Sequence, residues 1–361
     1  MTQDILFEVR GCVGCITLNR PKALNAMSLA MIRALTARLL AWRDDPRIHA
    51  VAIRGSRGDR PFGNFCAGGD IRYFHQAVLA GDPALEDLFT EEYTLDHLVH
   101  GYPKPYLAFM DGVVMGGGMG ISQGASHRLV TRNTVMAMPE TDIGLFPDVA
   151  GGYFLSRCPG AAGEWLALTG TALGGAQAIA LGLADHMLDA DAVAQAWDAL
   201  AGIDPQDAGQ LADWLARHAL AQPVTPIEHA AQIDAVFGLP TLAAMVKALE
   251  SDASDWAQQT LASVRKRSPL MQHVALAQLR RARVMTLADD LRMERDLVRH
   301  CFALRPVCDS ETVEGIRALA VDKDHSPRWK PARLEDVDAA EVAAFFVSPW
   351  PAHAHPLREL N

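Results

Sequence analysis

Apolar segments of strand length alternate with helical segments through the first half of the chain, and this alternation constrains the fold most strongly. Residues 5–19 have the pattern of a hairpin, and Ser28 is placed to cap a following helix. That helix would bury one apolar face, made of Leu29, Ile32, Leu35, Leu39 and Leu40. Further strands are expected at 49–56, 106–110 and 128–131. The alternation over residues 1–185 predicts an α/β fold built from parallel βα units.

The second half of the chain has a different texture. From residue 186 onward Ala, Leu, Asp, Gln and Arg dominate, and no segment has a convincing strand pattern. One core-facing helix is expected over 284–302, where apolar residues recur at helical spacing, at Val284, Ala288, Leu291 and Val298. We therefore expect an α/β core over residues 1–185 and an all-helical region over residues 186–361 packed on it.

The charge balance is acidic. The 361 residues include 33 Lys and Arg against 43 Asp and Glu, a net charge of −10. This balance gives no electrostatic reason to expect a nucleic-acid or anionic-membrane partner. No run approaches a membrane span, and the first residues have neither a signal-peptide nor a transit-peptide pattern. We expect a soluble, cytoplasmic protein without a membrane partner.

Six cysteines are too few in a chain of this length for a disulfide scaffold. Cys12 and Cys15 form a C-x-x-C, which redox pairs and metal sites use, but no second pair of ligands accompanies it. The flanking residues alternate as in an ordinary hairpin. We expect the hairpin, and no metal or redox cofactor.

Two glycine-rich segments, 65–71 (FCAGGDI) and 115–120 (MGGGMG), are the first candidates for a site. Neither fits the dinucleotide-binding or P-loop pattern. Such segments present backbone N–H groups without side-chain obstruction, and a glycine-headed helix has unpaired N–H groups at its start. Two N–H groups from different loops that converge would form an oxyanion hole. The alternative is that these glycines only permit tight turns and close packing.

A third segment, 138–152 (MPETDIGLFPDVAGG), sets two acids among apolar, Gly and Pro residues. Burial would raise the pKa of Glu140 and Asp148, which suits a general acid or base. Helix capping or ion pairing is the alternative for either residue alone.

Two other motifs carry less weight. Gly120–Gly124 matches the G-x-S-x-G of serine hydrolases, but Ser122 should lie inside the helix that follows the glycine-rich turn rather than on a sharp elbow. His353 and His355 lie in a Pro-rich segment, where a solvated tail is expected rather than a metal site.

Together these segments resemble the enoyl-CoA hydratase/isomerase (crotonase) superfamily. The resemblance rests on ITLNRPKALNAM (16–27), FCAGGDI, GVVMGGGMGIS (112–122) and MPETDIGLFPD (138–148), and it covers most of the chain. It implies a crotonase-like spiral of ββα units followed by helices. It also implies an acyl-CoA thioester as the ligand, and a homo-oligomer as a common arrangement.

The resemblance also assigns residues. The family's oxyanion hole maps onto the N–H groups of Ala67 and Gly117, its catalytic carboxylates onto Glu140 and Asp148, and its substrate-contacting glutamate onto Glu92. Gly117, Glu140 and Asp148 would thus also bind substrate. The implied contacts to CoA are Lys22, Ala23, Ala67, Gly68, Gly69 and Asp70.

Further segments, 91–96, 144–157, 166–170 and 322–331, are similar to the branch that hydrolyses 3-hydroxyisobutyryl-CoA in valine breakdown. In hydratases of the superfamily a second glutamate follows the glycine-rich turn, and here that position is Gly120. Its loss favours thioester hydrolysis, which needs only an activated nucleophile beside a polarised carbonyl. Two alternatives remain, an enoyl-CoA hydratase or isomerase and a non-catalytic acyl-CoA-binding protein. Whether Glu140 attacks directly, giving an anhydride, or activates water also stays open.

Overall fold

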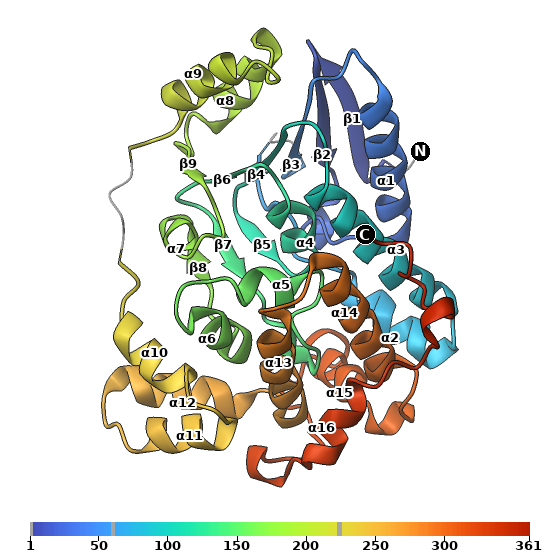
Figure 1. The fold of residues 1–361 in the computed structure, drawn as a ribbon, viewed down its shortest axis with the longest axis vertical. Coiled ribbons are helices and arrows are strands. Elements are labelled where there is room, and N and C mark those ends of the chain that lie inside the picture. Colours follow the sequence, from blue (N-terminus) through green and yellow to red (C-terminus); the bar gives the residue numbers. More distant parts are fainter. Residues whose placement is uncertain (1–2, 59–61, 222–225) are drawn as a thin grey trace. The chain divides into compact units, whose positions relative to one another are not determined.

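The chain divides into two compact units, and each is assembled from three segments (Figure 1). The computed structural model describes residues 3–58, 62–221 and 226–361. Unit 1 comprises 1–69, 94–137 and 172–226, and unit 2 comprises 70–93, 138–171 and 227–361. This differs from the two consecutive domains expected, because segments 70–93 and 138–171 pack with the C-terminal helices of unit 2 rather than with the strands that flank them in sequence.

Unit 1 is built on a six-stranded sheet of order β1-β2-β3-β4-β6-β9. Its strands are β1 (Ile5–Arg10), β2 (Val13–Leu18), β3 (Ala50–Gly55), β4 (Tyr106–Met110), β6 (His127–Val130) and β9 (His186–Met187). The hairpin partners β1 and β2 are antiparallel, and every other pair in this sheet is parallel, as the βα alternation predicts. A smaller sheet joins β5 (Val113–Met115), β7 (Val135–Ala137) and β8 (Leu173–Gly174).

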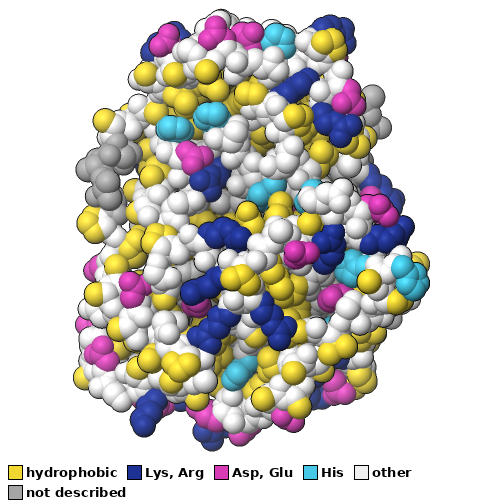
Figure 2. Space-filling view, viewed as in Figure 1, with side chains coloured by type: hydrophobic (Ala, Val, Ile, Leu, Met, Phe, Trp, Pro, Cys, Tyr) yellow, Lys and Arg dark blue, Asp and Glu magenta, His cyan; other side chains and the backbone are white. Residues whose placement is uncertain are grey.

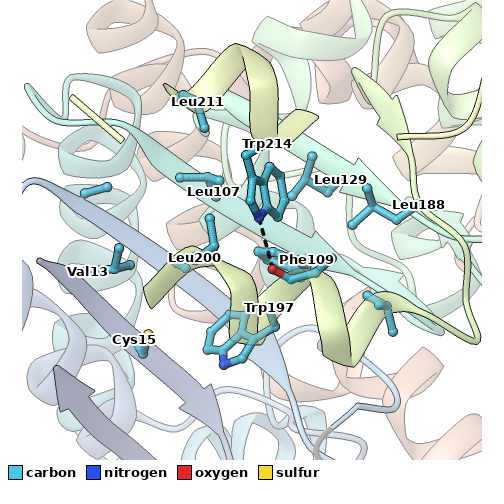
Figure 3. Packing of buried hydrophobic residues seen from close by; sticks show 14 residues of the cluster. Val13, Cys15, Leu107, Phe109, Leu129, Leu188, Trp197, Leu200, Leu211 and Trp214 are labelled. Carbon is cyan, nitrogen blue, oxygen red and sulfur yellow. Dashed lines mark hydrogen bonds between the residues drawn. The ribbon is translucent and has the colours of Figure 1, made fainter. Parts of the chain in front are cut away.

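Aliphatic side chains make up most of the core on one face of the larger sheet, and Phe109, Trp197 and Trp214 pack among them (Figure 3). Helices α8 (Val193–Ala199) and α9 (Ala208–His218) bring Trp197 and Trp214 against Phe109 of β4, with ring centroids 5.1 and 6.1 Å away. Trp214 Nε1 donates to Ala196 O at 3.1 Å, so the polar atom of this buried ring is paired. Helices α8 and α9, which follow the strands in sequence, therefore cover this face of the larger sheet.

Helix α1 (Leu29–Asp44) begins as expected, since Ser28 Oγ accepts a hydrogen bond from Met31 N at 3.3 Å. Ile32, Leu35 and Leu39 are buried, but Leu40 is 37% exposed. The predicted apolar face is thus wrong at Leu40, which turns toward solvent one position beyond the buried stripe.

Unit 1 also contains α4 (Gly117–Gln123) and α7 (Gly175–Ala180), and the residues of α3 (Ala84–His100) are divided between the two units. The remaining helices belong to unit 2. They are α2 (Ile71–Ala80), α5 (Gly151–Leu155), α6 (Ala162–Thr169), α10 (Ala230–Phe237), α11 (Leu242–Glu250), α12 (Asp255–Lys266), α13 (Pro269–Ala282), α14 (Leu287–Phe302), α15 (Glu311–Ile316) and α16 (Ala339–Phe345). Val284 is 91% exposed and precedes α14, so its expected place in the core is wrong. In the described residues after 187 no strand occurs.

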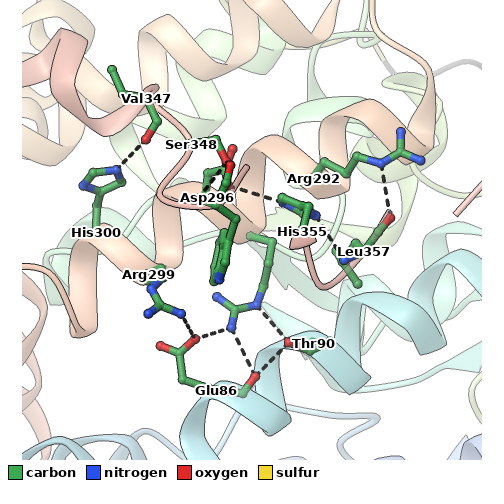
Figure 4. A network of polar contacts seen from close by, with 12 residues as sticks. Glu86, Thr90, Arg292, Asp296, Arg299, His300, Val347, Ser348, His355 and Leu357 are labelled. Atoms are coloured by element: carbon green, nitrogen blue, oxygen red, sulfur yellow. Dashed lines mark hydrogen bonds and ion pairs between the residues drawn. The ribbon is translucent and has the colours of Figure 1, made fainter. Parts of the chain in front are cut away.

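Polar contacts attach both α3 and the C-terminal residues to α14 (Figure 4). Arg295, almost fully buried, pairs with Glu86 and donates to Thr90 Oγ1 at 3.0 Å. His355 Nε2 lies 3.3 Å from Asp296 Oδ1, and His355 is only 6% exposed. The solvated tail expected here is wrong for His355, which packs against α14, but residues 351–354, including His353, are exposed as expected.

The surface mixes charges of both signs. Figure 2 shows acidic and basic side chains interspersed with apolar ones over the face in view, despite the net charge of −10. Among the described residues, no helix combines the length and the apolar character that crossing a bilayer requires.

Candidate active site

The two glycine-rich segments of unit 1 lie side by side. Cys66 forms a parallel bridge with Val114, and Met115 N donates to Cys66 O at 2.9 Å. A Cβ added to Gly118 would lie 2.4 Å from Cys66 O, and one added to Gly68 would lie 3.5 Å from Gly117 N. This close approach requires glycine, so the packing alternative is correct for Gly118 and it also brings the backbone of the two segments together.

Gly117 is the first residue of α4, after Gly116 in a positive-φ conformation (φ 49°). Within the described part of the chain, no hydrogen-bond acceptor is found for the N–H of Gly117. Helix-start amides have no partner inside their own helix, so this N–H is open to a ligand oxygen. The assignment of Gly117 to an oxyanion hole stays a prediction that this geometry permits.

The Ala67 amide is engaged in this structure. It donates to Leu24 O at 3.0 Å, and Met27 N in turn donates to Gly68 O at 2.8 Å. The buried Asn25 fixes this loop, with its Nδ2 donating to Ser56 O and Asn64 O. Ala67 could therefore bind a thioester oxygen only by exchanging or sharing its present acceptor.

The segments assigned to CoA also meet in part. Loop 20–27 runs along residues 67–69, and Lys22 in this loop is exposed. Asp70 has another function in the structure, since its side chain caps α2 by accepting from Tyr73 N at 3.3 Å.

The three candidate carboxylates all belong to unit 2. Glu92 lies on α3, Glu140 begins a short 3-10 helix over Glu140–Ile143, and Asp148 lies in the turn before α5. All are buried, at 2%, 6% and 6% exposure. Tyr93, also on α3, donates from its hydroxyl to Asp148 Oδ2 at 2.8 Å.

Burial changes the titration of these acids in the same direction. It raises the pKa of Asp148 to about 6, although the Tyr93 hydrogen bond favours the carboxylate. Burial, and then the charge of Asp148, raises the pKa of Glu92 to about 8. The same two causes hold the pKa of Glu140 well above its ordinary value. Asp148 is therefore a stronger acid than Glu92, and the pKa of Glu140 is raised for the same reasons.

Glu140 Oε2 and Glu92 Oε1 are buried, and no hydrogen-bond partner is present for either oxygen among the described residues. Buried polar atoms are normally paired, so these two oxygens are available to a substrate or to water. Arg267, which pairs with Asp142 at 3.2 Å, partly offsets the burial that raises the pKa of Glu140, because its positive charge favours the carboxylate.

The backbone around Asp148 is strained. Val149 (φ 55°) and Ala150 (φ 67°) both adopt left-handed conformations although neither is glycine. Such residues cost about 1–3 kcal/mol each and persist where the surroundings hold them. Sequence reasoning missed this strain, as well as Tyr93 and Arg267. The only available signal was that Tyr93 follows Glu92 directly.

The serine motif lies in helix α4, and the C-x-x-C lies in the β1–β2 hairpin, as expected. Ser122 lies inside α4, fully buried, and donates to Gly118 O at 2.8 Å, which agrees with the expected helical position. Cys12 and Cys15 are both free thiols, and burial raises the pKa of Cys15 to about 12. Cys12 instead lies near His49 and Asp204, whose side chains bond to each other at 2.8 Å.

Comparison with known proteins adds to this geometry. A family described as enoyl-CoA hydratase/isomerase matches residues 13–346. The chain belongs to this enoyl-CoA hydratase/isomerase family. Within curated members, it is 39% identical to the mitochondrial 3-hydroxyisobutyryl-CoA hydrolase of Rattus norvegicus, over 96% of this chain and 89% of the relative. It is 37% identical to the Homo sapiens protein of the same name, with the same coverage.

Solved structures of the family confirm the expected crotonase fold. A carnitinyl-CoA dehydratase from Mycobacterium thermoresistibile has a TM-score of 0.87 at 36% identity, with both chains fully covered. An enoyl-CoA hydratase from Rhodobacter sphaeroides has a TM-score of 0.85 at 34% identity, over 96% of this chain and 98% of that chain.

The family comparison corrects the expected location. The rat, chicken and human relatives are all named as mitochondrial, and this finding contradicts the cytoplasmic expectation. The acidic N-terminal residues predicted the cellular location poorly, because the composition of one short segment does not determine where a protein is located.

Proposed function

We propose that this protein hydrolyses 3-hydroxyisobutyryl-CoA to 3-hydroxyisobutyrate and CoA. The observation that carries the proposal is the buried acid cluster of Glu92, Glu140 and Asp148, in a chain 37–39% identical to curated hydrolases of that name. Glycine at position 120 leaves helix α4 without a carboxylate there. The acids of the reaction then come from the cluster in unit 2.

The proposed chemistry divides the work between backbone and side chains. The N–H of Gly117, with that of Ala67 once it leaves Leu24 O, would bind the thioester oxygen and stabilise its developing negative charge. Glu140, as its carboxylate, would either attack the carbonyl or take a proton from water, with Asp148 assisting proton movement. The C–S bond breaks, the carboxyl carbon gains the oxygen of water, and the CoA thiolate leaves with a proton from the cluster.

Substrate selection is proposed to involve the remaining polar groups. Glu92 keeps its proton near neutral pH, so it could donate a hydrogen bond to the acyl group as well as accept one. Lys22 and Ala23, together with residues 67–70, are proposed to contact CoA.

The rival function is hydration of an enoyl-CoA, the activity in the name of the Rhodobacter structure. Water addition across a double bond uses two acids poised around one water molecule. Glu140 and Asp148 could supply two acids. However, position 120, where hydratases of the superfamily carry their second glutamate, is a glycine in this chain.

One assay separates the two. Purified protein is given 3-hydroxyisobutyryl-CoA and release of free CoA thiol is followed, while crotonyl-CoA is monitored in parallel for loss of its enoyl absorbance. Thiol release without crotonyl-CoA hydration is the expected result. Hydration of crotonyl-CoA without thiol release would overturn the proposal.

A further inference from the structure

One carboxylate on α14 holds the turn over residues 147–152. Glu294 Oε2 accepts a hydrogen bond from Ala150 N at 2.8 Å, and Glu294 Oε1 accepts one from Gly152 N at 2.9 Å. These amides flank the start of α5, where backbone N–H groups lack partners within the helix. Glu294 thus caps α5 from another helix.

Two neighbours complete the attachment. Gln278 on α13 uses the same Nε2 to donate to Glu294 Oε1 at 2.9 Å and to Pro147 O at 2.7 Å. Asp290, one turn before Glu294 on α14, accepts from Tyr153 N at 2.9 Å. The turn is therefore attached on both sides of Asp148.

This arrangement accounts for a glutamate in the core. Glu294 is fully buried, a costly place for a carboxylate unless its oxygens are hydrogen-bonded. Three N–H donors offset part of that cost, while burial and the charge of Asp290 still raise the pKa of Glu294. Two of these donors belong to the strained turn that contains Val149 and Ala150. Strain of this kind persists only where the surroundings hold it.

We infer that Glu294 is a positioning residue that orients the Asp148 carboxylate through the amides of Ala150 and Gly152. Tyr93 bonds that carboxylate directly, and the attachment of the turn to Glu294 sets where the carboxylate meets the Tyr93 hydroxyl. The activity readout of this inference rests on the proposed function.

The first test is Glu294→Gln. The substituted glutamine would keep the size of the side chain and one acceptor oxygen, but its amide NH₂ would face a backbone N–H of the turn. We expect kcat to fall about 10–100-fold, as for displaced catalytic groups. KM should change by a smaller factor than kcat, because Glu294 bonds no residue assigned to CoA and reaches the acyl site only through Asp148.

The matched control is Glu164→Gln. Glu164 on α6 is also a buried glutamate, but it pairs with Arg283 and bonds no residue of the turn. Its replacement should lower thermal stability with little change in kcat. Equal kcat for the two variants would overturn the inference. If Glu294→Gln does not fold, Gln278→Met takes its place, with the same direction of effect expected.

Amide hydrogen exchange tests the attachment without any substrate. The amides of Ala150 and Gly152 should exchange at least about tenfold faster in Glu294→Gln than in wild type, while the Glu164→Gln protein leaves them unchanged. Unchanged exchange in Glu294→Gln would overturn the inference. Wild type that releases no thiol would overturn the proposed function instead, and the exchange result would still decide the role of Glu294 in holding the turn.

Discussion

The two units offer chemistry of different kinds. In unit 1 the candidate groups are the backbone amides of Ala67 and Gly117, on two segments that approach closely because of Gly68 and Gly118. In unit 2 they are buried carboxyl side chains, Glu92, Glu140 and Asp148, whose pKa values are raised mainly by burial. The backbone amides depend on the absence of side-chain volume, and the acids depend on removal from water. Unit 1 should therefore respond most to substitutions that add volume, and unit 2 to substitutions that remove an ionisable group at constant volume.

The largest effect should come from an isosteric change in unit 2. Glu140→Gln removes the ionisable group with little change in volume, so turnover should fall about 10²–10⁴-fold while the CoA ester still binds. Steady-state thiol release and calorimetric titration with a non-hydrolysable ester would measure the two quantities. Turnover above roughly a hundredth of the wild-type rate would contradict the assignment.

The pH dependence of stability should expose the desolvated acids. The pKa of Glu92 is raised from 4.5 to about 8, so the folded state holds a proton that the unfolded state has lost between these values. Stability from this group is complete below pH 4.5 and is lost as pH rises toward 8. Glu92→Gln should therefore be more stable than wild type at pH 8.5, by roughly 2–4 kcal/mol, and show little gain at pH 4.5.

Urea unfolding at the two pH values would measure this difference. The matched control is Glu91→Gln, because Glu91 is the sequence neighbour of Glu92 but is only half-buried. A gain for Glu92→Gln that is the same at both pH values would contradict desolvation as the cause.

Unit 1 should instead respond to added volume. The Cβ of Gly118→Ala would meet Cys66 O at 2.4 Å, so the glycine-rich segments must separate. We expect the free energy of unfolding to fall by about 1–3 kcal/mol, with a loss of activity. Gly202→Ala is the control, since nothing lies within 4 Å of the added methyl group. Equal unfolding midpoints in denaturant for the two variants would contradict the close approach.

The smallest effect should come from the surface of unit 1. Arg10 and Asp198 form an ion pair at 2.7 Å, with side chains 31% and 64% exposed. Asp198→Asn should cost only about 0.2–1 kcal/mol, because water and salt screen such pairs. The difference from wild type should shrink further in high salt, and a thermal-unfolding series against salt concentration would measure it.

Local patterns predicted local structure well. The hairpin, the Ser28 cap of α1 and the glycine-headed helix α4 follow from residues close in sequence, and each is present. Leu40 and Val284 were misplaced because helical spacing alone does not give the limits of a helix or of its buried face.

Long-range partners could not be predicted. Tyr93 bonds Asp148 across 55 residues, and Glu294 bonds Ala150 across 144. Periodicity says which residues turn inward, but it does not say which buried donor meets which acceptor. Glu140 and Asp148 were found because their apolar neighbours signalled desolvation, whereas Glu92 was assigned only by the family resemblance. The desolvation signal has no counterpart for the residues that position these acids.

The interleaved path of the chain has a consequence for synthesis. The chain crosses between the units five times, at 69/70, 93/94, 137/138, 171/172 and 226/227. Unit 1 cannot close its core before α9 has left the ribosome. Segments 70–93 and 138–171 must wait for helices that are translated later still. Contacts so distant in sequence slow folding. No terminal truncation can isolate one unit, and we expect the nascent chain to depend on chaperones until α13 and α14 have been made.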